Sequence, residues 1–154
     1  MFLTVHGPAG ALVGALAPDP VSAFALGVLS HAVLDIIPHG DERLGGKRTG
    51  KEMFRFILTL GLIDSAILLA VLLALLQPWQ SWPSWSVLAG IVGGVIPDGF
   101  QLLHQLFPHV RWLERYQHLH DDIHLHIVRY DPPFALGMVV QLLALTAIVA
   151  VSWR

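Results

Sequence analysis

The longest apolar run of the chain, at residues 53–76, reads MFRFILTLGLIDSAILLAVLLALL. It exceeds the roughly 20 apolar residues that a helix needs to cross a bilayer. Further runs of about this length lie at residues 21–37, 85–107 and 134–153, and a shorter apolar stretch lies at residues 2–17. The shorter stretch fits a thin span or a re-entrant helix. We therefore expect an all-α bundle of four to five transmembrane helices that forms one domain over the whole chain.

The composition of the chain excludes several classes of protein. Only 13% of its 154 residues are charged and 55% are hydrophobic, with a mean hydropathy of +0.64. A soluble domain carries about 25% charged residues, so the polar surface here is too small for a water-exposed globule. The net charge of −2 offers no basic excess for nucleic acid, and the absence of cysteine excludes disulfides and thiolate metal sites. A small integral membrane protein remains, one with nine histidines.

Basic residues in the predicted loops indicate the orientation of the chain, because cytoplasmic loops are enriched in lysine and arginine. Arg43, Lys47 and Arg48 follow the run at residues 21–37, so we expect this loop in the cytoplasm. The uncharged loop at residues 77–84 contains two tryptophans and is expected on the far side. We expect the inner (cytoplasmic) membrane of a prokaryote, with membrane lipids as the partners.

Residues 108–131 return to the basic side and have the pattern of an amphipathic helix lying on the membrane. Apolar residues recur there at intervals of three to four, and histidines occupy the opposite face. The positions expected to face lipid are Trp112, Leu113, Tyr116, Leu119, Ile123 and Ile127.

Two pairs of glycines have the spacing that lets helix backbones approach closely. Gly10 and Gly14 form one pair, and Gly90 and Gly94 form the other. We expect these positions at helix–helix contacts.

Three aspartates, Asp35, Asp64 and Asp98, fall inside the predicted spans. An ionised side chain in hydrocarbon costs about 2.5–3.5 kcal/mol even on lenient insertion scales, so these groups should face the bundle interior, protonated, paired or bound to a cation. Lysine and arginine are nearly absent from the spans, whereas histidines lie nearby. Carboxylates and imidazoles without a basic partner are ligands that a divalent metal prefers. We therefore predict a metal centre with one or two ions, and zinc is the metal expected.

The spacing of these residues supports shared ligation, because residues four apart lie on one helix face. His31 and Asp35 have this spacing, as do His120 and His124. Asp64 or Asp121 is expected as the general base, with a structural hydrogen-bond acceptor as the alternative for Asp64. The predicted metal ligands are His31, Asp35, Asp98, His120 and His124, with His6 as a further candidate. The residues expected to hold an anionic substrate are Arg43, Lys47, Arg48, Arg111, Gln101 and His104.

Residues 30–39, SHAVLDIIPH, resemble the SHxxLDxxPH element of the membrane-bound metal-dependent hydrolase proteins, which are distantly similar to zinc-dependent phospholipase C. Residues 96–98, IPD, resemble the PD element of that family, and a histidine on an N-terminal Gly/Ala-rich helix also recurs in it. The resemblance implies hydrolysis of a phosphoester or similar bond. The metal ligands that it implies are His6, His31, Asp35 and Asp98.

The chain departs from this family pattern after Asp98. Phe100 and Gln101 stand where the family has further Asp and His residues. A second histidine element of the family is missing, and residues 120–124, HDDIH, are at best its substitute.

These observations predict a membrane-embedded metal-dependent hydrolase that acts on a phosphoester or related bond of a lipid or lipid-linked substrate at the cytoplasmic face. A divalent-metal or proton transporter or channel is the first alternative, because buried carboxyl and imidazole groups also form ion paths. Polar residues are scarce in the outer halves of the predicted spans, which argues against a path across the membrane. A non-catalytic structural module, in which the polar cluster only determines helix packing, is the second alternative.

Overall fold

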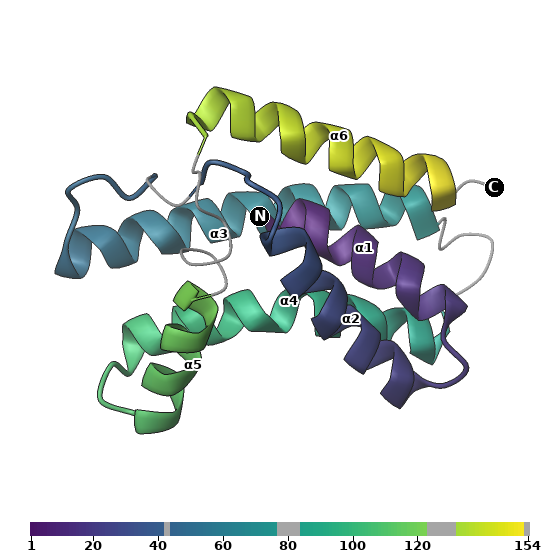
Figure 1. The fold of residues 1–154 in the computed structure, drawn as a ribbon, viewed down its shortest axis with the longest axis horizontal. Helices are drawn as coiled ribbons and strands as arrows, with labels where there is room; N and C mark the ends of the chain where they lie inside the picture. The colour runs from purple at the N-terminus through teal and green to yellow at the C-terminus, as the bar shows by residue number, and fades with distance from the viewer. Residues whose placement is uncertain (42–43, 77–83, 123–131, 153–154) are drawn as a thin grey trace.

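The computed structural model describes residues 1–41, 44–76, 84–122 and 132–152. These residues form six α-helices and no strand (Figure 1). The all-α class is thereby confirmed for the described part of the chain. The helices are α1 (Leu3–Leu16), α2 (Pro20–Asp35), α3 (Gly50–Leu76), α4 (Trp85–Leu106), α5 (Arg111–Asp122) and α6 (Phe134–Ser152).

Three helices, α3, α4 and α6, are long and apolar enough to cross a membrane. Their apolar side chains point largely outward; Leu62 of α3 and Leu143 of α6 are 63% and 65% exposed. The helices α1 and α2 have 14 and 16 residues, which makes them about 21 and 24 Å long at 1.5 Å per residue. Both lengths fall short of a hydrocarbon core of about 30 Å. The structure therefore supports three spans of the four to five expected.

The short helix α1 is the centre of the bundle. It contacts α2, α3, α4 and α6, and its first turn lies near the middle of the molecule in Figure 1. Residues 5–11 are all buried. A tight turn leads from α1 into α2, where the Asp19 carboxylate accepts hydrogen bonds from the backbone N–H groups of Val21 and Ser22 and so caps the helix. The hydroxyl and N–H groups of Ser22 hold the pKa of Asp19 below its usual value.

Glycines bring α1, α2 and α4 into backbone contact. A Cβ added to Gly90 would collide with the carbonyl oxygen of Gly10 and lie 2.9 Å from the Cα of Gly14. Gly27 of α2 packs against the Gly90 carbonyl in the same way, and Gly94 packs against the backbone of His6. The expected close approach at the two glycine pairs is confirmed. This contact brings together the segments of α1, α2 and α4 that carry the histidines and aspartates predicted as metal ligands.

The helix α5 packs on α4 rather than lying wholly on a lipid surface. Leu113 is only 2% exposed, and the Tyr116 hydroxyl donates a hydrogen bond of 3.0 Å to the Pro97 carbonyl. The expectation that Leu113 and Tyr116 face lipid is wrong, because α4 covers this side of the helix. Trp112 and Leu119 remain 54% and 60% exposed. Ile123 and Ile127 lie outside the described residues.

Substitution of Gly90 by alanine tests this packing. Because the new methyl group meets backbone atoms that cannot rotate away, Gly90→Ala should lower the free energy of unfolding by about 1–3 kcal/mol. Gly99→Ala on the same helix is the matched control, since nothing in the described chain lies within 4 Å of an added Cβ there. Thermal unfolding in one detergent compares the two variants. Equal melting temperatures would contradict the proposed close contact.

Candidate metal centre

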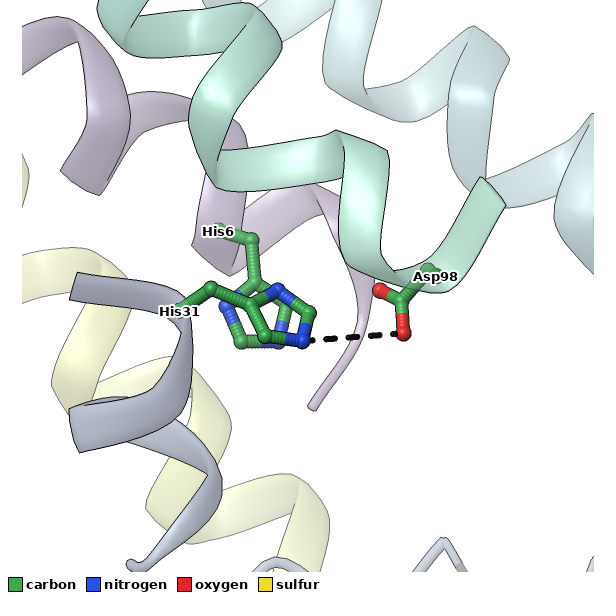
Figure 2. Close-up of side chains that lie close together, drawn as sticks. All are labelled: His6, His31 and Asp98. Atoms are coloured by element: carbon green, nitrogen blue, oxygen red, sulfur yellow. Dashed lines mark ion pairs between the residues drawn. The ribbon is translucent and has the colours of Figure 1, made fainter. Parts of the chain in front are cut away.

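Five residues expected as metal ligands meet at one place inside the bundle. His6 comes from α1, His31 and Asp35 come from α2, Asp98 comes from α4 and His120 comes from α5. Figure 2 shows the stacked rings of His6 and His31 facing Asp98, with ring centres 3.9 Å apart. His6, His31 and Asp35 are at most 2% exposed. Residues of four helices thus converge on one polar cluster, although the first, His6, and the last, His120, lie 114 positions apart in the sequence.

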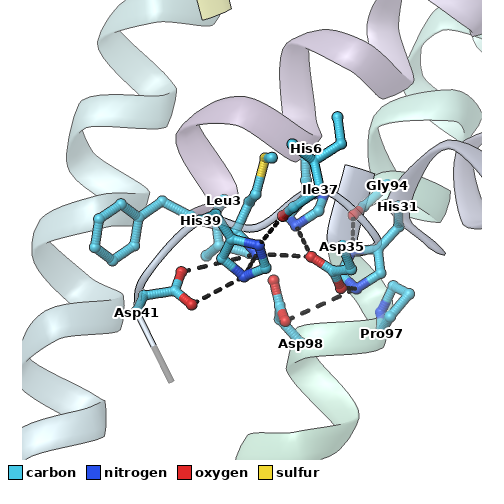
Figure 3. Close-up of polar contacts among 12 residues, drawn as sticks. Leu3, His6, His31, Asp35, Ile37, His39, Asp41, Gly94, Pro97 and Asp98 are labelled. Atoms are coloured by element: carbon cyan, nitrogen blue, oxygen red, sulfur yellow. Dashed lines mark hydrogen bonds and ion pairs between the residues drawn. The ribbon is translucent and has the colours of Figure 1, made fainter. Parts of the chain in front are cut away.

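The carboxylate of Asp35 is the middle of this cluster (Figure 3). Its Oδ1 lies 3.1 Å from Nε2 of His6, and its Oδ2 lies 2.9 Å from Nε2 of His31. Nε2 of His120 lies 3.5 Å from the same Oδ2, and Oδ1 of Asp98 lies 3.9 Å from Nε2 of His31. Three imidazoles from three helices therefore direct a nitrogen at one carboxylate.

The donor atoms fit a divalent cation. Two groups, His6–His31–Asp98 and His31–Asp35–His120, each place their ligand atoms within 4.8 Å of one another. Nitrogen and carboxylate donors suit zinc and the other first-row metals. Nδ1 of His6 is buried and has no hydrogen bond within the described ranges, while Nε2 of His6 and Nε2 of His31 are buried against the Asp35 carboxylate. A buried nitrogen without a partner, such as Nδ1 of His6, is costly, and the two Nε2 atoms lie where a cation could share the Asp35 carboxylate with them.

The orientation of His31 adds to this fit. Its Nδ1 lies 2.9 Å from the carbonyl oxygen of Gly94, an acceptor that requires a proton on Nδ1. In the neutral form of a ring with this proton, the lone pair is on Nε2, which faces the carboxylates. Metal-binding histidines commonly donate their other N–H group to a carbonyl in this way.

An ammonium group also reaches the cluster. The Met1 amino nitrogen lies 2.6 Å from Oδ1 of Asp35 and 2.9 Å from Nε2 of His39. His39 in turn lies 2.9 Å from Asp41. Burial raises the pKa of Asp41, but the contact with His39 and the ammonium outweigh it and hold that pKa below its usual value. Sequence reasoning missed this cation, because no local motif marks an amino group that becomes a partner only after folding.

Asp64 has a different environment from the cluster. Its Oδ2 accepts a hydrogen bond of 2.5 Å from the backbone N–H of Leu3, and its Oδ1 accepts from the N–H and the hydroxyl group of Thr4. A carboxylate at the free N–H groups of a first helical turn acts as a cap supplied by another helix. These contacts favour the structural alternative for Asp64 over a role as general base.

The cap predicts how Asp64 variants behave. Asp64→Ala leaves two part-buried N–H groups without their acceptor and should lower the free energy of unfolding by about 1–3 kcal/mol. Asp64→Asn keeps one carbonyl oxygen and should lose distinctly less. Denaturant unfolding in detergent measures both values, and metal analysis of the same samples should find no change for Asp64→Asn. A loss of metal in that variant would place Asp64 among the ligands instead.

The remaining predicted residues are spread around the cluster. The Gln101 amide lies 2.8 Å from Nε2 of His120 and 3.4 Å from Asp98, so it links two of the cluster residues. Asp121 accepts a hydrogen bond of 2.8 Å from Gln117. Nδ1 of His104 is buried and has no hydrogen bond among the described residues.

The basic residues expected to bind an anion lie further out. Arg48 donates to the carbonyl group of Gly45 and lies over the ring of Phe56. Lys47 and Arg111 are exposed. Arg43 and the predicted ligand His124 lie outside the described residues.

Comparison of the chain with protein-family models, curated proteins and solved structures finds no match. The function of the chain must therefore be inferred from the geometry of the cluster.

Proposed function

We propose that the chain is a membrane-embedded metal-dependent hydrolase that cleaves a phosphoester or related bond of a lipid or lipid-linked substrate. The observation that carries the proposal is the His31 ring: its Nδ1 is held by the Gly94 carbonyl, while its buried Nε2 faces the carboxylates of Asp35 and Asp98 at 2.9 and 3.9 Å. A ring held in this way is prepared to donate a lone pair to a cation. The resemblance of residues 30–39 to a hydrolase element points to the same chemistry.

Each residue of the cluster has a role in this proposal. His6, His31, Asp35, Asp98 and His120 would hold one or two ions, with zinc expected from the nitrogen and oxygen donors. A bound divalent cation supplies a Lewis acid that polarises a phosphoryl oxygen and makes water a stronger acid. Gln101 orients His120 and Asp98 through its amide group.

Asp121 is the proposed general base. It follows His120 directly in α5 and lines the same cavity as Asp98 and His120. Its position lets it accept a proton from water beside the cluster, whereas the oxygens of Asp64 are engaged by α1. We propose that this side of the bundle, to which the basic loop after α2 belongs, faces the cytoplasm of a prokaryote.

A packing role is the second candidate, and the Met1 amino group favours it. An ammonium 2.6 Å from Asp35 already balances one buried negative charge. In this alternative the imidazoles and carboxylates hold four helices together without an ion, as buried hydrogen-bonded networks do.

Metal analysis separates the two candidates. The protein purified in detergent should contain at least one equivalent of zinc or another divalent metal, and a chelator should lower its melting temperature. His31→Ala and Asp35→Ala should abolish the bound metal. His118→Ala is the matched control, because His118 is exposed on the same helix as His120 and should retain it. Metal-free protein with a melting temperature indifferent to zinc and chelator would favour packing alone.

The proposed base gives a test of catalysis itself. Loss of a general base costs about 10²–10⁴ in rate, so Asp121→Asn should lower kcat for a phosphoester substrate by at least about 100-fold while the bound metal stays unchanged. Glu114→Gln, an exposed change on the same helix, should keep full activity. Turnover is measured on a panel of phosphomonoesters and phosphodiesters. Equal rates for both variants would remove Asp121 from the mechanism.

A further inference from the structure

A cavity of about 910 Å³ lies between α3 and α4 and reaches the candidate metal centre. Asp98 and His120 line it at the cluster. Much of its remaining wall is apolar and includes Phe56, Leu60 and Leu102. The volume falls in the range of about 300–1,000 Å³ that is usual for ligand pockets, and one polar end with apolar walls matches an amphiphilic ligand.

Two glycines of the cavity wall have no packing role. Most other glycines of the helices lie where a Cβ would collide with a neighbouring backbone, as at Gly10, Gly27 and Gly90. At Gly61 of α3 and Gly99 of α4, nothing in the described chain lies within 4 Å of an added Cβ, and both residues line the cavity. A glycine inside a helix costs about 1 kcal/mol relative to alanine. The two glycines thus widen the space between the helices at a cost in helix stability that no contact explains.

The cavity is open toward the apolar outer surface of the bundle. Leu58 and Leu62 line it and are also 37% and 63% exposed. Both leucines belong to α3, and α3 and α4 are two of the three helices suited to a membrane. A hydrocarbon chain could therefore enter sideways from the bilayer without crossing water.

A cation lies beside the cavity wall. The Arg48 guanidinium lies 4.6 Å from the ring centre of Phe56, which lines the cavity, and it donates to the carbonyl groups of Leu44 and Gly45, which line it too. The acidic residues Asp41, Asp98 and Asp121 line the same space. An anionic head group would therefore need the bound cation at the cluster, together with Arg48, to offset these carboxylates.

We propose that this cavity binds one hydrocarbon chain of a phospholipid, with the phosphate group at Asp98 and His120 and the chain between Gly61 and Gly99. The inference deepens the proposed function and rests on it for the chemistry at the phosphate. It adds a chain-binding subsite, a lateral entrance past Leu58 and Leu62, and two glycines that determine how wide a chain is accepted.

Photolabelling in vesicles tests the subsite. The full chain is reconstituted in phosphatidylcholine vesicles that contain a small share of phosphatidic acid with a diazirine at mid-chain. After irradiation, mass spectrometry should find adducts on the cavity residues Leu60 and Leu102 as well as on the outward-facing Leu69 and Leu73, which are 58% and 47% exposed. Unlabelled phosphatidic acid should compete for the cavity positions and not for the outward ones. Adducts confined to the outward residues would overturn the proposal.

Variants that fill the cavity sharpen this test. Gly61→Leu and Gly99→Leu, from opposite walls, should each lower labelling of the cavity residues about tenfold, since a leucine side chain displaces two or more methylene groups. Labelling of Leu69 and Leu73 should stay unchanged. Ala70→Leu is the control, because Ala70 is exposed on α3 and does not line the cavity; it should label like the unmodified protein. Undiminished cavity labelling in both filled variants would overturn the subsite.

Bound metal is measured in the same samples to separate this inference from the proposed function. The filled variants should keep the metal content of the unmodified protein. Metal without labelling of the cavity would overturn the chain-binding subsite alone. Labelling of the cavity without metal in any preparation would leave the chain-binding part of the subsite standing, but it would overturn both the metal-dependent reaction and the placement of the phosphate group at Asp98 and His120.

Discussion

The first turn of α1 is partly buried in the bundle, and its free backbone N–H groups are paired with side chains of other helices. Side chains from distant parts of the chain accept these protons: Gln141 of α6 from Phe2, and Asp64 of α3 from Leu3 and Thr4. A fully buried N–H group left unsatisfied would cost about 1–3 kcal/mol, so these bonds stabilise the partly buried start of α1. These bonds hold the start of α1 against α3 and α6. They thereby place His6, one turn further along, beside α2 and α4.

The geometry of the candidate metal centre depends on the close packing of α1, α2 and α4. Gly10, Gly27 and Gly90 let three backbones meet, and the carbonyl of Gly94 then comes within hydrogen-bonding distance of His31. A larger side chain at these glycines would separate the helices and with them the imidazoles and carboxylates they carry. Packing and site geometry are therefore not independent properties of this chain.

The balance of charges in the cluster bears on whether it binds a metal ion or only holds the helices together. Asp35 and Asp98 bring two carboxylates close to three imidazoles, and an ammonium group lies beside Asp35. Buried carboxylates need a compensating positive charge. One ammonium can balance one carboxylate, so a metal ion would account for the second carboxylate and for the convergence of three imidazole nitrogens on Asp35.

The sequence alone determined the helical class, the approximate bounds of the helices and the set of polar residues that could bind a metal or take part in catalysis. Apolar runs and prolines act locally, and the observed α2, α4 and α6 begin and end within two residues of the runs at 21–37, 85–107 and 134–153. The pairing of His31 with Asp35 followed from helical spacing for the same reason.

Only the tertiary structure decided what these residues do to one another. In the folded chain, the His31–Asp35 pair lies beside His6, Asp98 and His120. Asp64 caps the first turn of α1, and Leu113 and Tyr116 pack toward α4. Spacing along a helix specifies a face but not the partner of that face. That choice depends on contacts between segments far apart in the chain, and here on glycines whose importance appears only when two backbones meet.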